Sequence, residues 1–148
     1  MQLRPLLKKV QLDHVFMLLI LAGAFLAVYQ FAHSKSLWGD EASLARNIID
    51  RDFVGLLKPL DSIQIAPVGF LFVEKAMQLT FGSGERALRF FPLLGFLAAI
   101  PVFFALTRHL FGNNRFALFA TALFAFNPVL LFFSADLKQY STDVFFCL

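Results

Sequence analysis

The sequence predicts an all-α integral membrane protein with three transmembrane helices, two interfacial amphipathic helices and the start of a fourth span. Composition is the first reason: of 148 residues, 59% are hydrophobic, 21 are Phe and only 16% are charged. A soluble domain of this size needs more polar surface than that. The second reason is that the apolar residues form long runs. The net charge of +3 is too small and too dispersed to favour nucleic-acid binding.

Three apolar runs are long enough to cross a bilayer, which takes about 20 helical residues. The predicted spans cover residues 14–33, 87–107 and 115–134. They contain three prolines, Pro92, Pro101 and Pro128. Transmembrane helices tolerate proline because neighbouring groups satisfy the freed carbonyls. The first run favours a retained helix over a cleaved signal peptide, because it is long and no A-x-A site follows it.

Basic residues predict the orientation of these spans. One group precedes the first span, and a second fills the short loop between the other two: Arg4, Lys8 and Lys9, then Arg108, His109 and Arg115. The positive-inside rule places both groups in the cytoplasm, and therefore the N-terminus as well. Residues 34–86 and the stretch that begins at Ser134 are then expected outside.

Two interfacial helices are expected in the outer segment, over about 40–53 and 66–81. In the first, Leu44, Ala45, Ile48 and Ile49 form an apolar face, and Arg46, Asn47, Asp50 and Arg51 form the opposite one. The second is apolar enough to be a span, but Glu74 and Lys75 lie at its middle. A charge at the bilayer centre costs about 2.5–3.5 kcal/mol on insertion scales, so an interfacial helix is favoured.

Asp40 and Glu41 are the candidate catalytic residues. They follow Trp38 and Gly39 a few residues past the first span. In one interpretation they only start a helix: Asp40 caps it, Glu41 favours its dipole, and Trp38 belongs to the interfacial aromatic belt. In the other, a carboxylate held at the membrane surface is a general base for a hydroxyl acceptor. The local pattern leaves both open.

Arg86 and Arg89 share one side of a helix that enters the second span. Their guanidinium groups could snorkel to the headgroup level, which is common. They could also form a fork for a lipid-linked phosphate, because guanidinium donors match phosphate oxygens bidentately. The spacing does not decide between these roles.

A third polar cluster follows the third span. A helix here would place Asp136, Gln139, Tyr140 and Asp143 on one stripe, with Lys138 on the opposite side. Such a stripe at the end of a span usually faces a cavity or a partner helix. A solvated cap is the alternative. The chain turns apolar again at Val144, as a fourth span would.

No metal site or cofactor is expected. The single cysteine, Cys147, excludes a disulfide framework and a cysteine-based metal site within the chain. Of the three histidines, His14 begins a span, His33 ends it and His109 lies in the basic loop. Each is expected to be structural.

The order of these motifs resembles a known family. A basic N-terminus and first span precede W-G-D-E-A at 38–42, G-x-G-E-R-A-L-R-F at 82–90, and N-P at 127–128 followed by K-Q-Y-S-x-D at 138–143. This order is similar to the membrane-embedded glycosyltransferases of the C-type fold. Within them it resembles the bacterial branch related to protein O-mannosyltransferases and lipid A aminoarabinose transferases. The resemblance covers residues 12–148.

The resemblance implies inverting transfer of a sugar from a polyprenyl-phosphate carrier to an acceptor hydroxyl of a lipid, glycan or protein, outside the bacterial inner membrane. Asp40, beside Glu41, would be the general base. Arg86, Arg89 and Lys138 would bind the donor phosphate, and Tyr140, Asp136 and Asp143 would line the site. Ser43 and Ala66-Pro67 stand where the two named branches carry other residues, so neither activity is assigned.

Members of this family have many more spans. Residues 1–148 are therefore expected to be the N-terminal part of a polytopic enzyme, or to act with another subunit. Two other classes stay open. One is a small membrane binding or scaffold protein in which Asp40 and Arg89 are anchors. The other is a transporter fragment in which the stripe between 136 and 143 lines a polar path.

Overall fold

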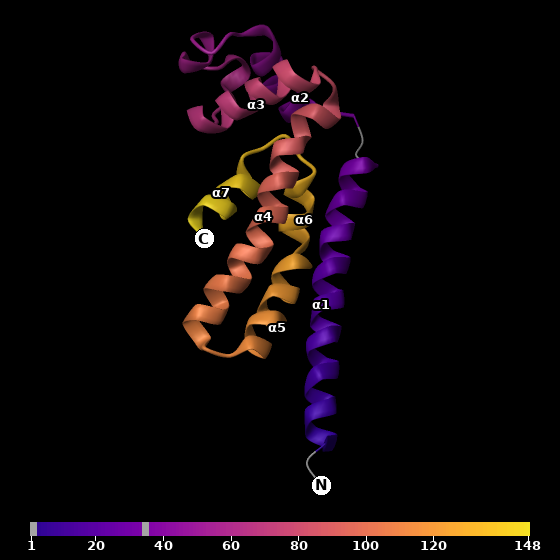
Figure 1. The fold of residues 1–148 in the computed structure, drawn as a ribbon. Coiled ribbons are helices and arrows are strands. Elements are labelled where there is room, and N and C mark those ends of the chain that lie inside the picture. The colour runs from indigo at the N-terminus through magenta and orange to yellow at the C-terminus, as the bar shows by residue number, and fades with distance from the viewer. Residues whose placement is uncertain (1–2, 34–35) are drawn as a thin grey trace.

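A computed structural model shows an arrangement built from helices, in which the described residues contain no strand. The structure describes residues 3–33 and 36–148, and of residues 3–12 it describes the backbone alone. Ser34, where the predicted outer segment begins, lies outside the described residues. Long helices run side by side, and a group of shorter elements lies across one end of them (Figure 1).

Two helices are long and apolar enough to cross a membrane. They are α1 (Leu3–Ala32), which qualifies over Asp13–Ala32, and α4 (Glu85–Phe111). The spans predicted at 14–33 and 87–107 thus coincide with real helices. Helix α4 runs through both of its prolines, Pro92 and Pro101, without a break. Their lengths and compositions indicate an all-helical protein with membrane-spanning segments.

The third predicted span, 115–134, is wrong as a single helix. Helix α5 (Asn114–Ala125) and helix α6 (Pro128–Ser134) meet at a bend of 59°. The Asn127 side chain accepts hydrogen bonds from the N–H groups of Val129 and Leu130, so it caps α6, and Pro128 takes the first helical position. Because proline has no N–H, it suits that position better than a helix interior. Helices α5 and α6 together form either one broken span or a re-entrant loop.

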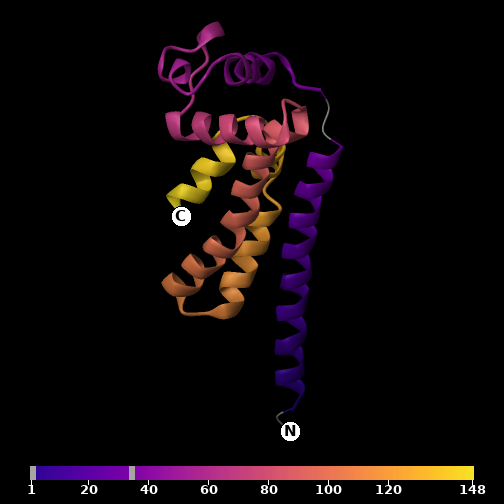
Figure 2. The same ribbon diagram turned by 45° about the horizontal axis from the view of Figure 1, so that its top comes forward.

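Helices α2 (Gly39–Asp50) and α3 (Val68–Phe81) form a cap on the long helices, joined by two 3₁₀ turns, η1 (Gly55–Leu57) and η2 (Asp61–Ile63). Figure 2 shows α3 lying across the end of the long helices. The cap, α4 and the 134–139 segment share one core of buried residues: Leu44, Ala45, Ile48, Leu56, Phe70, Leu71, Leu88 and Leu137. Burial of this apolar area holds the cap to the long helices.

The sequence placed two details of α2 wrongly. The helix ends at Asp50 rather than at 53, because Arg51 is extended and its guanidinium group pairs with Asp61 at 2.8 Å. Asn47, expected on the exposed face, is 2% exposed. Its amide accepts from the Asp61 N–H at 2.8 Å and donates to the Ser43 carbonyl at 2.9 Å. Asn47 therefore fastens the η2 turn to α2.

A second core lies between the long helices. It contains Ala27 of α1, Leu93, Phe96 and Ile100 of α4, and Ala125 of α5. Small residues allow these helices to approach closely, as small residues do in membrane helix pairs. A Cβ atom added at Gly23 would lie 2.7 Å from the Ala125 carbonyl oxygen. The end of the chain, α7 (Tyr140–Cys147), packs against α4 at Gly95, where an added Cβ would lie 3.0 Å from the Thr142 Cα.

Replacement of Gly95 is expected to disturb the contact between α4 and α7. The Gly95→Ala variant should lose about 1–3 kcal/mol of stability, because the backbone of Thr142 has to move. Gly69 in α3 is the matched control, since an added Cβ there meets no atom within 4 Å. Gly69→Ala should gain stability through its higher helix propensity. Unfolding curves in mixed micelles would compare them, and equal effects would contradict the close approach.

Candidate functional site

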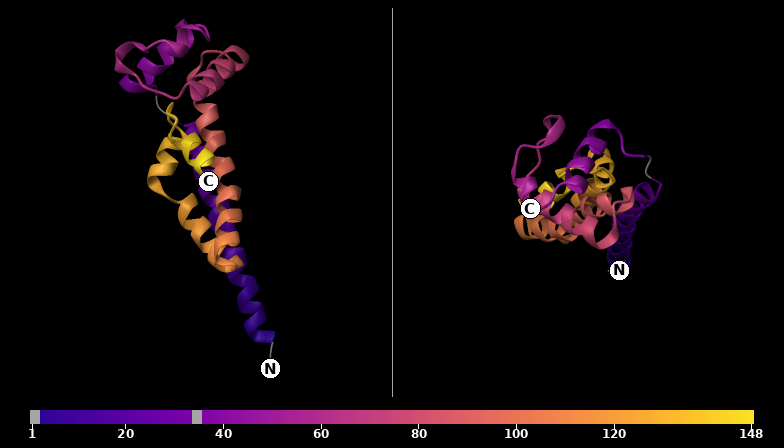
Figure 3. Two further views of the ribbon diagram at one scale, coloured as in Figure 1. Left: turned by 90° about the vertical axis from the view of Figure 1, so that its left-hand side faces the viewer. Right: turned by 90° about the horizontal axis from the view of Figure 1, so that it is seen from above.

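The predicted site residues come together at the capped end of the bundle. The first turn of α2, the first turns of α4 and the segment 135–139 meet there (Figures 1 and 3). The N-terminal end of α1 and the loop between α4 and α5 lie toward the opposite end (Figure 1). Positions 40, 89 and 138 therefore lie at the same end of the long helices.

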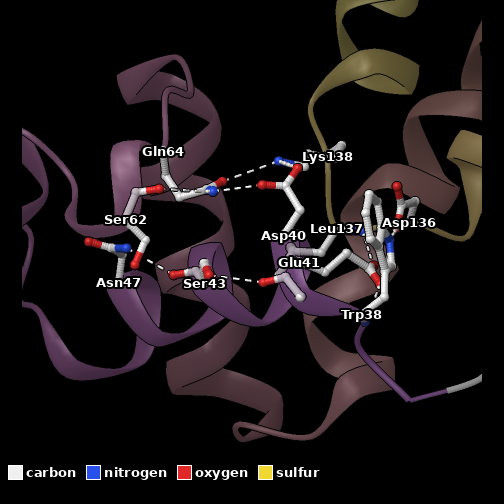
Figure 4. Close-up of polar contacts among 11 residues, drawn as sticks. Trp38, Asp40, Glu41, Ser43, Asn47, Ser62, Gln64, Asp136, Leu137 and Lys138 are labelled. Atoms are coloured by element: carbon white, nitrogen blue, oxygen red, sulfur yellow. Dashed lines mark hydrogen bonds and ion pairs between the residues drawn. The ribbon is translucent and has the colours of Figure 1, made fainter.

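Asp40 and Glu41 are neighbours in the chain but belong to two different networks. Both lie in the first turn of α2, where successive side chains point about 100° apart. The residue that caps the helix is Trp38, so the interpretation of Asp40 as the cap is wrong. Figure 4 shows Asp40 facing Gln64 and Lys138, while Glu41 and Trp38 face the other way.

The first network joins Asp40, Lys138 and Gln64. The Lys138 ammonium group lies 2.6 Å from Asp40 Oδ2, and the Gln64 amide donates to Asp40 Oδ1 at 2.6 Å. Gln64 Oε1 accepts in turn from Lys138 at 3.2 Å, which closes a ring of three side chains. The hydrogen bonds from Lys138 and Gln64 hold the pKa of Asp40 below its usual value. Asp40 is thus ionised at neutral pH, and 41% of its side chain is exposed.

The second network is buried and centres on Glu41. Arg89 Nε donates to Glu41 Oε1 at 2.9 Å and Nη2 to Oε2 at 2.5 Å, which makes a bidentate ion pair. Glu41 also accepts from the Leu137 N–H at 2.6 Å. Burial alone would raise the pKa of Glu41, but Arg89, the Asp136 carboxyl group and the Leu137 N–H more than offset it, so this pKa is lowered. The fork of Arg89, expected at the donor phosphate, is occupied by a carboxylate.

Asp136 lies against this ion pair and is 4% exposed. Its Oδ1 accepts from the Trp38 indole N–H at 3.2 Å. Its Oδ2 is buried, and no donor among the described residues reaches it. Burial, and the Glu41 carboxyl group beside it, raise the pKa of Asp136 to about 7. Asp136 therefore exchanges a proton near neutral pH, as acid–base groups in active sites do.

A cavity of about 740 Å³ opens beside the second network. Its volume is within the range of small-molecule sites. Its walls come from the end of α1, the first turns of α2 and α4, and the segment after α6. Residues that line it include Tyr29, His33, Trp38, Arg89, Phe132 and Asp136. Asp40 and Lys138 lie outside the lining, so the two networks serve different surfaces.

Three predicted site residues are not part of these networks. Arg86 is exposed, and its guanidinium group donates to the Ala32 carbonyl at the end of α1 at 3.1 Å. Tyr140 and Asp143 lie on α7; Tyr140 packs edge-on against Phe133 at 4.5 Å between ring centroids, and Asp143 is exposed. The predicted stripe does not form, because residues 136–139 are not helical.

Asp136 and Lys138 were predicted on opposite sides of a helix, but they lie in a tight turn. The backbone N–H of Lys138 donates to the Asp136 carbonyl at 2.8 Å, which closes a tight turn instead of a helix. The Leu137 N–H is bound by Glu41 and the Lys138 side chain by Asp40. Contacts from α2 therefore outweigh the local helix preference. In the part of the chain that is described, no group of three or more His, Cys, Asp or Glu residues could hold a metal ion.

Gln64 is the site residue that the sequence did not predict. It follows Ser62 and Ile63, both of which have positive φ, 59° and 56°. Such a backbone costs about 1–3 kcal/mol for each residue and persists only where surrounding contacts fix it. Here this backbone conformation brings the Gln64 amide to both Asp40 and Lys138. A lone amide between two isoleucines, Ile63 and Ile65, was the only available signal.

A further buried carboxyl group lies away from these networks. Glu74 of α3 has no exposed surface, and neither oxygen has a partner among the described residues. Burial raises its pKa from 4.5 to about 9. Its neighbour Lys75 has partners: it donates to the carbonyls of Ile48 and Ile49 at the end of α2. Glu74 is thus protonated in the fold at neutral pH.

We expect Glu74→Gln to stabilise the protein, and increasingly so as the pH rises. The native state binds the proton of Glu74 more tightly than the unfolded state, so stability falls between pH 4.5 and about 9. At pH 7 this costs about 3 kcal/mol, which the amide avoids. Unfolding curves at pH 5 and pH 7 would measure the difference, with the exposed Asp50→Asn as the control. A gain that does not depend on pH would contradict the burial of Glu74.

Comparison of the chain with known protein families, with curated proteins and with solved structures finds no match. The resemblance to C-type glycosyltransferases therefore depends on the sequence motifs alone. The structure contributes an independent observation, which is the placement of those motifs. Acidic and basic side chains from segments almost 100 residues apart meet at one end of the long helices.

Proposed function

We propose that the chain is part of a membrane glycosyltransferase. In this proposal it helps to transfer a sugar from a polyprenyl-phosphate carrier to an acceptor hydroxyl, outside the bacterial inner membrane. One observation carries the proposal: the Asp40–Lys138 pair and the Glu41–Arg89 pair, with Asp136, lie at the same end of the candidate spans. The second of these networks borders a cavity of about 740 Å³. A lipid-linked donor would present its phosphate and sugar at this level.

The carboxylate of Asp40 is the proposed base. It is ionised and exposed at the surface of the cap, so an acceptor hydroxyl can reach it from the aqueous side. In the transition state the sugar gains positive character while negative charge builds on the departing lipid phosphate. Asp40 would take the proton of the hydroxyl as the new bond forms. A direct attack of this kind inverts the anomeric carbon.

Lys138 and Arg86 are the proposed partners of the leaving phosphate. Lys138 lies against Asp40, and exposed Arg86 lies at the end of α1. Both can place positive charge where the phosphate departs, which is the main electrostatic contribution in such reactions. The buried Arg89 is bound to Glu41. We assign it to fixing the first turn of α2 rather than to the phosphate itself.

The arrangement favours an enzyme over the two alternatives. A transporter fragment would need the polar stripe from Asp136 to Asp143, and that stripe does not form because 136–139 is not helical. A scaffold protein would have no need of a buried acidic group whose pKa is raised to about 7 beside a cavity, as Asp136 is. Perturbed carboxyl groups in clefts are typical of active sites.

Transfer of a labelled sugar tests the proposal. Membranes from cells that express the gene for this chain would be incubated with polyprenyl-phosphate sugars, and compared with membranes from cells that lack it. Transfer to lipid, glycan or protein that depends on the gene is expected. Its absence with every donor would remove the enzyme hypothesis.

Sidedness is tested separately, by labelling cysteines introduced at positions 40 and 112 in intact cells. The basic residues near position 112 predict that only position 40 is labelled from outside. Labelling of position 112 alone would show the opposite orientation in the membrane, with the acidic cluster in the cytoplasm. An extracytoplasmic reaction would then be impossible at this site.

A further inference from the structure

Donors from three parts of the chain meet on one carboxylate, that of Glu41 in α2. Its Oε1 accepts from Arg89 Nε of α4 at 2.9 Å and from the Leu137 N–H at 2.6 Å. Its Oε2 accepts from Arg89 Nη2 and from the Trp38 N–H at 3.4 Å. Both oxygens thus face N–H donors, and an ionised carboxylate is the form that only accepts. A proton on Glu41 would point at one of these donors.

The carboxyl group of Asp136 completes this cluster. It shares a side-chain hydrogen bond with Glu41, and its Oδ1 accepts from the Trp38 indole N–H at 3.2 Å. Two carboxyl groups in such contact keep a proton between them, because like charges so close cannot both ionise. Asp136 Oδ2 is buried and has no donor among the described residues. The proton therefore belongs to Asp136, which donates to Glu41.

This proton balances the charge of the cluster. Arg89 supplies one positive charge, which Glu41 offsets in a buried pair. Ionised Asp136, at 4% exposure, adds a negative charge that nothing in the pair offsets. Other titratable or charged side chains around the cluster come from α1, α2, α4 and the segment after α6: Tyr29 and His33, Asp40, Glu85, and Lys138. Histidine is the side chain that ordinarily titrates near neutral pH, so a test has to separate His33 from Asp136.

The segment 135–139 is tied to the first turn of α2 through this cluster. Glu41 holds the Leu137 N–H and the Asp136 carboxyl group, and Trp38 holds Asp136 from the other side. Figure 4 shows these side chains gathered beside the start of α2. Asp136 and Trp38 also form part of the cavity wall. Repulsion between Glu41 and an ionised Asp136 would therefore act on the contact between the segment and α2.

We propose that the proton of Asp136 is a latch that holds residues 135–139 on the first turn of α2, and that loss of this proton to solvent as the pH rises releases the segment and opens the cavity wall beside Trp38. The inference goes beyond the proposed function and does not depend on it. It concerns a contact that sets the shape of the cavity whatever the cavity binds.

The size of the effect follows from the change in proton affinity. Burial, and the Glu41 carboxyl group beside it, raise the pKa of Asp136 from 3.8 to about 7. In a released segment that reaches water, the pKa returns toward 3.8. The latched form binds the proton more tightly, so the released form gains as the pH rises from 3.8 to about 7 and gains no more above it. Between pH 5.5 and pH 8.5 the ratio of released to latched chains should rise about 30-fold.

Hydrogen exchange of the Leu137 amide measures the release directly, because that N–H is bound by Glu41. The purified chain in micelles would be followed by NMR at pH 5.5 and pH 8.5, with the intrinsic exchange rate at each pH divided out. We expect the protection factor of Leu137 to fall about 30-fold. The Phe126 amide, bound to the Ala122 carbonyl in α5, is the internal reference. It reports any general loss of stability, such as that from Glu74, and should fall less.

Variants separate this proton from other groups. In Asp136→Asn the amide donates to Glu41 as the protonated acid does, and it does not titrate. Its Leu137 protection factor should differ by about threefold or less between the two pH values. His33→Gln, which removes the nearby histidine, should keep the full response, and so should Asp143→Asn, which removes an exposed acid from α7. If Asp136→Asn does not fold, as judged by helical content, the responses of the unaltered chain and of His33→Gln still decide.

Several results would overturn the inference. One is a Leu137 protection factor that stays constant or falls only as far as that of Phe126. Another is an equal fall in Asp136→Asn, and a third is loss of the response in His33→Gln. These outcomes are separable from the proposed function. Gene-dependent sugar transfer with constant Leu137 protection would remove the latch and leave the enzyme. The expected fall in protection without transfer from any donor would remove the enzyme and leave the latch.

Discussion

Replacement of Arg89 by leucine is expected to cost about 3–5 kcal/mol of stability, because it leaves Glu41 buried and without its cation. Arg89 is 3% exposed and Glu41 has no exposed surface. The carboxylate also holds the Leu137 N–H, so its displacement would release the segment that carries Asp136 and Lys138. Unfolding curves in mixed micelles would measure the loss.

A double-mutant cycle tests whether the loss comes from the unpaired charge. Glu41→Gln keeps an acceptor for the Leu137 N–H but removes the charge. The protein with both Glu41→Gln and Arg89→Leu should therefore be more stable than Arg89→Leu alone, by about 1–3 kcal/mol. Arg86→Leu, one turn earlier on α4 and exposed, is the matched control and should cost about 1 kcal/mol or less. Additive effects of Glu41→Gln and Arg89→Leu would contradict the buried pair.

Hydropathy was sufficient to predict most of the fold. Its long apolar runs located α1 and α4. Helix α3, which the charges of Glu74 and Lys75 led us to expect at the interface, has 14 residues, fewer than the about 20 that cross a bilayer. It could not predict the bend between α5 and α6. Pro92 and Pro101 lie within α4, which continues through both of them, whereas Pro128 lies at the break between α5 and α6. The difference is Asn127, whose side chain can replace the helical hydrogen bonds that are lost at that position.

The meeting place of the site residues was predictable, but their partners were not. Topology alone brings positions 40, 89 and 138 to one end. Which carboxylate faces which cation depends on the rotation of α2, where Asp40 and Glu41 point about 100° apart. The turn at 136–139 was also out of reach, because it is fixed by Asp40 and Glu41, almost 100 residues earlier. Local patterns carry no information about contacts of that range.

Asp40→Asn is expected to lower the rate of sugar transfer by about 10²–10⁴-fold, the usual contribution of a general base. Asn keeps an acceptor for Gln64 and nearly the same shape. The Asp40–Lys138 pair is partly exposed, and exposed pairs contribute about 0–1 kcal/mol, so membrane insertion and folding should be retained. Asp50→Asn removes an exposed acid from the same helix and should leave transfer unchanged. Full activity in Asp40→Asn would show that another group takes the proton of the acceptor hydroxyl.

The pH dependence of transfer distinguishes a base from a structural residue. Lys138 and Gln64 hold the pKa of Asp40 below its usual value, so the acidic limb of the rate profile should lie below the range of an ordinary aspartate. Removal of the charge in Lys138→Met weakens that effect, and the limb should move to higher pH. A residue that only supported the fold would change the rate without moving the limb. The direction of this shift therefore ties the proton transfer to Asp40 itself, independently of how much activity each variant retains.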